Sequence, residues 1–271
     1  MKLSIGKAWE ETSAFLGREA KLVAPVALAT FALPSILAKW AYPQGGAGGG
    51  AGLAMLLVLV LVLIGQMTVI LLVNGWRGSI GEAMGKAASR LPTLIGALII
   101  VFLPIAIIAT FAIGGALVGA GITDPSAVTP QTLAKMPGFL WIVTLLSLLL
   151  IFLGVRMFPV SAIAASEPVG PIALLKRSWQ VTRGVFWRLL VLVILLGLIA
   201  LVLDWTVTAV VGSIAALTAG EAKAFNTSAL VVALASGLVG ALVTTVSAAM
   251  AGRVYAQLAG PEASVPTVPK S

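Results

Sequence analysis

Six long stretches of the chain carry almost no charge, and they alternate with shorter segments that hold most of the basic residues. A membrane-spanning helix needs about 20 predominantly apolar residues. The spans are predicted at 22–38, 53–73, 91–123 and 137–155, in a fifth helix that opens with 189–203, and at 229–252. The expected fold is an all-α integral membrane protein with six transmembrane helices, so both ends of the chain lie on one side.

The placement of lysine and arginine predicts which side that is. Of the 17 basic residues, 13 lie in the N-terminal segment, the 76–91 and 165–188 segments and the C-terminal end. Short loops rich in Lys and Arg stay on the cytoplasmic side of a membrane. We therefore expect both termini in the cytoplasm. The alanine-rich composition, for its part, favours the inner membrane of a bacterium as the location.

The amino-acid composition excludes several classes of activity. The chain has no cysteine and no histidine, which rules out thiolate nucleophiles, imidazole bases and Cys/His metal sites. Paired carboxylates are also missing from the predicted spans. We expect a protein that is not an enzyme and that has no metal and no other cofactor.

Three of the basic segments have the periodicity of an amphipathic helix at a membrane surface. Their apolar residues recur at helical spacing: Ile5, Ala8, Trp9, Thr12, Phe15 and Leu16; then Ile80, Ala83, Met84, Ala87 and Leu91; then Leu174, Ser178, Trp179, Thr182, Val185 and Phe186. Trp9 and Thr12 match Trp179 and Thr182 at one offset, so we predict three pseudo-repeats of a surface helix followed by two spans. Their bounds are 1–75, 76–165 and 166–258, in a single membrane domain over 1–258.

Two further expectations concern long segments. A straight helix from 186 to 217 would exceed the thickness of the bilayer core, so a break or an exit from the membrane is expected near Asp204. The stretch 204–228 could also re-enter the bilayer. The proline-containing residues 259–271 are expected to form a disordered tail.

One stretch before the fifth span resembles a known family. It contains Arg156, Pro159, Glu167, Gly170-Pro171, Arg177-Ser178-Trp179 and Thr182-Arg183-Gly184. It is similar to the membrane domain found beside bacterial glycerophosphoryl diester phosphodiesterases, and to related stand-alone six-span proteins of unassigned function. The resemblance implies a membrane platform without the catalytic domain, which is a separate soluble barrel in that family.

Two functions from different classes stay open. The first is a non-enzymatic membrane protein in envelope or lipid homeostasis, which contacts anionic phospholipid through its basic segments. The second is a transporter or channel for a small or lipid-like substrate. Membrane lipids are the expected partners and nucleic acid is not; a homo-oligomer is possible.

The candidate residues follow from charge and position. The candidates for binding lipid headgroups are Lys176, Arg177, Arg183, Arg188 and Arg156. Lys176, Arg177 and Arg183 are expected on the polar face of a helix over 170–184. The expected interface anchors are Trp9, Trp179, Trp187 and Trp205, because the indole ring prefers the headgroup level. Glu167, as a partner of Arg156, and Asp204, at the outer interface, are the candidates for ion pairing or ion coupling.

Overall fold

The protein is all α-helical over the residues that the structure, a computed structural model, describes: 3–43, 49–122, 133 and 138–260. Six helical segments are long and apolar enough to cross a membrane, as predicted. They are Ala20–Ala41, Gly49–Val73, Ile80–Gly119, Phe139–Ser166, Phe186–Ala219 and Thr227–Ala259. The predicted tail, 259–271, begins too early, because the last helix still includes Ala259, and residues 261–271 lie outside the described residues.

The first two spans form one hairpin. A short helix α1 (Ile5–Arg18) precedes α2 (Ala20–Ala27), a π-helical turn η1 (Leu28–Ala32) and α3 (Leu33–Ala41), which together make the first span. The second span is α4 (Gly49–Val73). Because η1 inserts an extra residue into the helical ladder, it turns Thr30 and Phe31 onto α4, where both side chains are buried.

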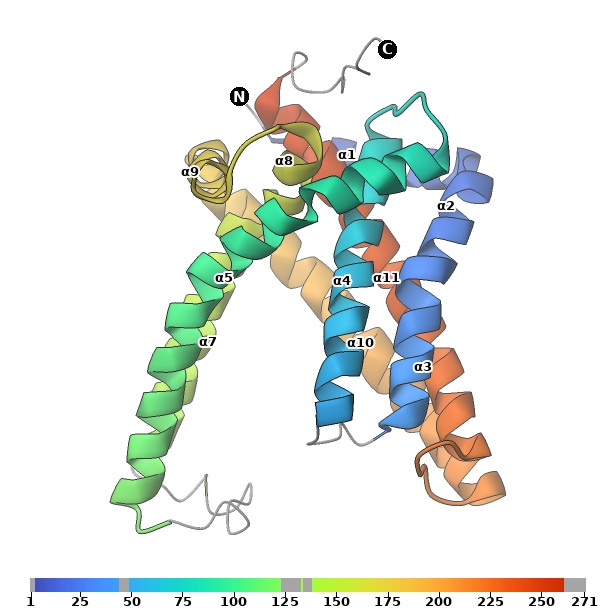
Figure 1. The fold of residues 1–271 in the computed structure, drawn as a ribbon, viewed down its shortest axis with the longest axis vertical. Helices are drawn as coiled ribbons and strands as arrows, with labels where there is room; N and C mark the ends of the chain where they lie inside the picture. Colours follow the sequence, from blue (N-terminus) through green and yellow to red (C-terminus); the bar gives the residue numbers. More distant parts are fainter. Residues whose placement is uncertain (1–2, 44–48, 123–132, 134–137, 261–271) are drawn as a thin grey trace.

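The middle hairpin is built differently. Helix α5 (Ile80–Gly119) runs without interruption from a segment across the end of the bundle into the third span, and it bends on the way (Figure 1). The fourth span is α7 (Phe139–Met157), followed by α8 (Val160–Ser166). Helix α5 has no buried side chain after Ala97, and α7 buries only Leu153 and Val155 near its end. Figure 1 shows the two helices splayed away from the remaining spans.

The last hairpin consists of α10 (Phe186–Ala219) and α11 (Thr227–Ala259), preceded by the short helix α9 (Pro171–Thr182). The predicted break near Asp204 is wrong: α10 is continuous through that residue. No proline lies within α10, so nothing removes a backbone hydrogen bond there. Figure 1 shows α10 crossing the bundle obliquely, so that its length need not extend along the bundle axis.

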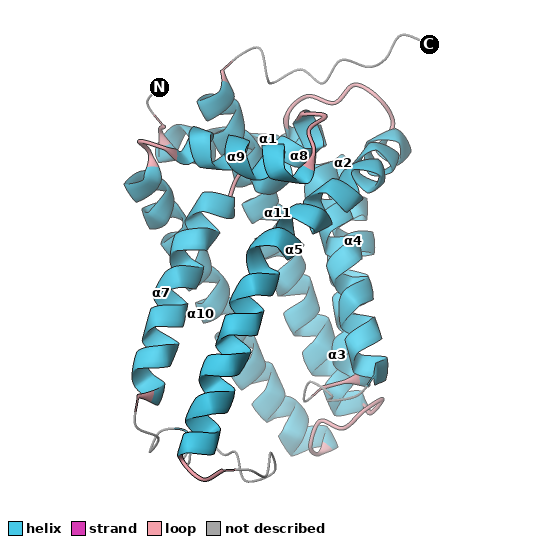
Figure 2. Cartoon of the chain, turned by 60° about the vertical axis from the view of Figure 1, so that its left-hand side comes forward, coloured by secondary structure: helices cyan, strands magenta, loops and turns pink. Residues whose placement is uncertain are grey.

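Helix α1, the start of α5 and helix α9 all lie at one end of the bundle, with the C-terminal turns of α11 (Figures 1 and 2). We call this the α1–α9 end. The main hydrophobic core is also concentrated there. It joins the last turns of α4, the small residues of α8 and the end of α11, where residues such as Met67, Ile163 and Ala249 are fully buried. A dense core at this end gives a rigid support for the polar groups around it.

Candidate functional site at the α1–α9 end

The three short segments at the α1–α9 end bury small side chains at matching positions. Ala8, Ala83 and Ser178 are fully buried, and so are Thr12, Ala87 and Thr182 one turn later. All six lie on the faces that the sequence predicts to be apolar. Small buried residues allow each segment to lie close against the spans beneath it, which leaves its longer side chains at the surface.

At two of the three surface segments, a non-helical residue separates the segment from the apolar helix that follows it. Glu19 separates α1 from α2 with a non-helical backbone (φ −105°, ψ 21°). Gly184, with φ +87°, separates α9 from α10, a conformation that only glycine adopts without strain. Arg183 therefore lies beyond the end of α9 in an extended conformation, and the prediction that a helix over 170–184 carries it is wrong.

Glu167 links α9 to α11. Its Oε1 atom lies 3.2 Å from Nε of Arg177, and the Tyr255 hydroxyl of α11 donates a hydrogen bond to the same oxygen. Tyr255 is 1% exposed, so this carboxylate is the partner of a fully buried hydroxyl. Burial alone lowers the pKa of Arg177, but the adjacent carboxylate outweighs it and raises the pKa above its ordinary value. The guanidinium thus stays charged and engaged.

Arg156 lies in an aromatic cage and does not pair with Glu167, so that predicted pairing is wrong. Its guanidinium carbon lies 4.8 Å from the centre of the Trp179 ring, with Phe152 and Phe186 at 5.6 and 5.3 Å. One Nη donates to the Thr182 hydroxyl at 2.9 Å. Cation–π contacts of this kind hold the charge where α7, α9 and α10 meet, and Glu167 is already occupied by Arg177.

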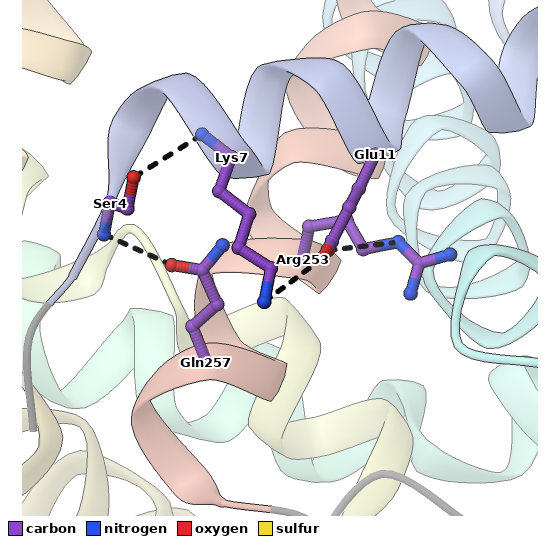
Figure 3. A network of polar contacts seen from close by, with 5 residues as sticks. All are labelled: Ser4, Lys7, Glu11, Arg253 and Gln257. Carbon is purple, nitrogen blue, oxygen red and sulfur yellow. Dashed lines mark hydrogen bonds and ion pairs between the residues drawn. The ribbon is translucent and has the colours of Figure 1, made fainter.

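A second polar network ties α1 to the end of α11 (Figure 3). Glu11 lies 3.8 Å from Nζ of Lys7 and 4.0 Å from Nε of Arg253. The Ser4 backbone N–H donates to the side-chain oxygen of Gln257 at 3.1 Å. Arg253 and Gln257 are one turn apart on α11, so α1 lies along a polar edge of that helix.

The structure divides the predicted basic residues into two groups. Arg156, Arg177 and Arg188 are engaged by the protein itself; Arg188 donates to the backbone carbonyl of Leu3 at 2.8 Å. Lys176 and Arg183 are exposed. Within the described part of the chain no carboxylate lies at ion-pair distance from either of them.

Aromatic residues accompany the exposed bases. Trp187 is 76% exposed, and Trp9 and Trp179 are about half exposed. On α9 the exposed Ile172, Lys176 and Trp179 follow the spacing i, i+4, i+7 and form one stripe that leads to Arg183. We call these four residues the α9 stripe.

A pocket of about 340 Å³ lies at the α1–α9 end, between the α1–α2 junction and the turn after α4. Its polar lining comes from Arg18, Glu19, Asn74 and Arg253, with Trp76 at its wall. Arg18 and Glu19 are paired at 3.1 Å. The pocket brings two guanidinium groups to a hollow at the same end as the α9 stripe.

The remaining predicted residues lie toward the other end of the bundle. Asp204 pairs with Lys39 of α3 at 3.7 Å, and the neighbouring Trp205 is 74% exposed. The sequence indicated neither the Lys39 partner nor the roles of Glu11, Arg253 and Tyr255. The available signal was the polar spacing of Arg253, Tyr255 and Gln257 at the end of the last apolar run.

These arrangements supply fixed and free cations next to aromatic rings. Guanidinium and ammonium groups are the usual protein ligands of phosphate. In the described ranges no group of three or more His, Cys, Asp or Glu side chains is placed to hold a metal ion. The cationic groups at this end are of the kind that can bind an anion.

Comparison with known proteins gives one result. The model of a family described as "Domain of unknown function (DUF7847)" matches residues 3–258. No curated protein and no solved structure matches the chain.

Proposed function

Since the chain belongs to the DUF7847 family over residues 3–258, whose description assigns no activity, we propose a function from the structure itself. The protein is a non-enzymatic multi-pass membrane protein that holds anionic phospholipid at its α1–α9 end and serves envelope or lipid homeostasis. The α9 stripe carries this proposal, because it combines two exposed cations with two exposed apolar side chains. Such a combination is typical of helices at a membrane interface.

The proposed location is the bacterial inner membrane, with the α1–α9 end on the cytoplasmic side. Its support is the distribution of basic residues together with the position of α1 and the end of α11 at one end of the bundle (Figure 1). Anionic lipid on the cytoplasmic leaflet attracts basic segments by about 1 kcal/mol per charge. In this orientation the basic α1–α9 end lies at the cytoplasmic leaflet, whose anionic lipids attract it.

Cysteine labelling tests this orientation, because the chain has no cysteine of its own. Ser89→Cys in the exposed start of α5 and Ala224→Cys between α10 and α11 report opposite ends. In intact cells a membrane-impermeant maleimide should label Ala224→Cys and leave Ser89→Cys unlabelled until the cells are opened. The reverse pattern would contradict the proposed orientation.

We also propose three structural repeats, each made of a surface helix and two spans. The matching burial of Ala8, Ala83 and Ser178 supports this proposal, as does the position of α1, the start of α5 and α9 at one end (Figure 2). The resemblance to the membrane domain found beside glycerophosphoryl diester phosphodiesterases separately supports a role as a membrane platform. The repeats would then present three similar helices to one leaflet.

Replacing both free cations tests the lipid proposal. The variant Lys176→Gln with Arg183→Gln should retain roughly thirtyfold less anionic phospholipid through gentle detergent extraction, since the two lost charges are worth about 1 kcal/mol each. Native mass spectrometry measures the retained lipid. Lys223→Gln, an exposed lysine at the other end, is the matched control.

The result also distinguishes attraction of charge from burial. The loss should shrink at high salt, because mobile ions screen exposed charges. Trp179→Ala should loosen α9 whatever the lipid charge, since the ring also packs on Arg156. Unchanged lipid retention in the double Gln variant would leave the bases as a topology signal alone.

A transporter or channel is the second candidate, and the Lys39–Asp204 pair favours it, because charged groups on apolar helices often mark a substrate or ion path. The platform proposal expects no movement of fluorescent phospholipid between the leaflets of proteoliposomes. Such movement, abolished by Asp204→Asn, would favour the transporter.

A further inference from the structure

An ion pair joins three helices in the half of the bundle opposite the α1–α9 end. Nζ of Lys39 on α3 lies 3.7 Å from Oδ1 of Asp204 on α10. The same Nζ donates a hydrogen bond of 3.1 Å to Oγ of Ser236 on α11. The cluster of Lys39, Asp204 and Ser236 takes no part in the proposed binding of anionic lipid at the α1–α9 end.

The depth of the cluster follows from the helix lengths. Helix α10 continues over residues 205–219 beyond Asp204, and α11 begins at Thr227 before Ser236. At 1.5 Å per residue the cluster lies about 14 to 22 Å from the ends of these helices. Helix α11 is about 50 Å long, which exceeds the 40 to 45 Å of a bilayer with its headgroups. A bilayer centred on α11 would therefore place the cluster in the outer part of the acyl region, within reach of the headgroups.

A pocket of about 290 Å³ opens beside Lys39. The hydroxyl-bearing residues Thr208, Ser228 and Ser236 are among those that line it, and Gly212 and other small residues leave it open. Ligand pockets usually range from about 300 to 1,000 Å³. This one suits a polar headgroup and not a whole lipid molecule.

Both charges retain hydrogen-bonding capacity. Their separation of 3.7 Å is longer than a hydrogen bond. The ammonium group of lysine has three donors, of which Ser236 takes one, and the described residues donate no hydrogen bond to the Asp204 carboxylate. The side chains are 48% and 58% exposed, so a ligand can reach them.

A cation and an anion side by side, both incompletely satisfied, complement a ligand with the opposite arrangement. Lys39 lines the pocket, and Asp204 lies beside Lys39 without lining the pocket itself. We propose that the pocket and the adjacent Asp204 bind the headgroup of a zwitterionic phospholipid with a primary amine. The phosphate lies against Lys39 and the pocket hydroxyls, and the ammonium group donates to Asp204. The inference concerns a different end and a different lipid class from the anionic-lipid proposal, and it does not depend on it.

The test compares phosphatidylethanolamine with phosphatidylcholine of identical acyl chains, bound to the full chain and measured by native mass spectrometry. The trimethylated choline headgroup has no N–H to donate to Asp204. The wild type should prefer phosphatidylethanolamine by roughly tenfold, the effect expected of one charged hydrogen bond. Asp204→Asn should abolish the preference, and Lys39→Gln should reduce binding of both lipids.

Two further variants separate binding from stability. Thr208→Leu fills the pocket without altering the ion pair, and it should lower the retention of phosphatidylethanolamine. Lys223→Gln, outside the pocket, should change nothing. Equal binding of the two lipids by the wild type would overturn the proposal. It would also be overturned if Asp204→Asn lowered only the melting temperature while Thr208→Leu kept full lipid binding.

Discussion

Replacing Glu167 with alanine is expected to lower the free energy of unfolding by about 1.5 to 4 kcal/mol. The change leaves the Tyr255 hydroxyl buried without its acceptor, which costs about 1.5 to 3 kcal/mol for a hydrogen bond to a charged group. It also removes the partner of Arg177, which adds at most about 1 kcal/mol because that side chain is partly exposed. Unfolding in mixed detergent micelles measures the loss.

Replacing Tyr255 and Arg177 one at a time separates their contributions to the loss of stability in Glu167→Ala. Tyr255→Phe removes only the hydroxyl and should account for most of it, whereas Arg177→Gln should cost about 1 kcal/mol or less. A double-mutant cycle between Glu167 and Tyr255 gives their coupling directly. Equal losses in Glu167→Ala and Arg177→Gln would mean that the buried hydroxyl contributes nothing to stability.

The pairing of Glu167 illustrates what local pattern can and cannot predict. Helical spacing identified Ala8, Ala83 and Ser178 as members of the inward faces, because burial on a helix repeats every three to four residues. It did not identify Tyr255 as the partner of Glu167, since 88 residues separate the two. Nor did it identify Arg177, ten residues away, as the base that pairs with Glu167. The charge of Arg156 is instead satisfied by aromatic rings and the Thr182 hydroxyl.

The six apolar helices were predictable from hydropathy, because the need to satisfy backbone groups in lipid leaves few alternatives to a helix. Helix continuity was harder to predict. The length of the segment predicted a break or an exit from the membrane near Asp204. The helix has no break there, because a tilted helix accommodates the same length without one. Interruptions occur where the backbone demands them, as at Gly184 with its positive φ.

The irregular geometry of the first apolar helix could not be predicted from the sequence either. The π-helical turn η1 contains no proline and no glycine, so no residue type within Leu28–Ala32 predicts it. Its consequence is specific: Thr30 and Phe31 lie directly against Gly65 of α4. The requirement for glycine at 65 therefore depends on a distortion in a different helix.

Gly65→Ala is accordingly expected to lower the free energy of unfolding by at least about 2 kcal/mol, because overpacking a tight core forces side chains or backbone to move. A Cβ atom at this position would lie 2.5 Å from Cε1 of Phe31 and 2.7 Å from Cβ of Thr30, both in buried side chains. The Thr30 hydroxyl is also fixed by a hydrogen bond of 2.7 Å to the Val26 carbonyl.

Gly52→Ala is the matched control on the same helix, since an added Cβ there meets no atom within 4 Å. It should change stability by no more than about 0.5 kcal/mol. Thr30→Ala removes part of the obstruction, so Thr30→Ala with Gly65→Ala should be more stable than the sum of the single losses predicts. If Gly65→Ala and Gly52→Ala unfold at the same detergent concentration, η1 and α4 do not pack as tightly as the structure places them, because a rigid contact at these distances cannot admit a methyl group without cost.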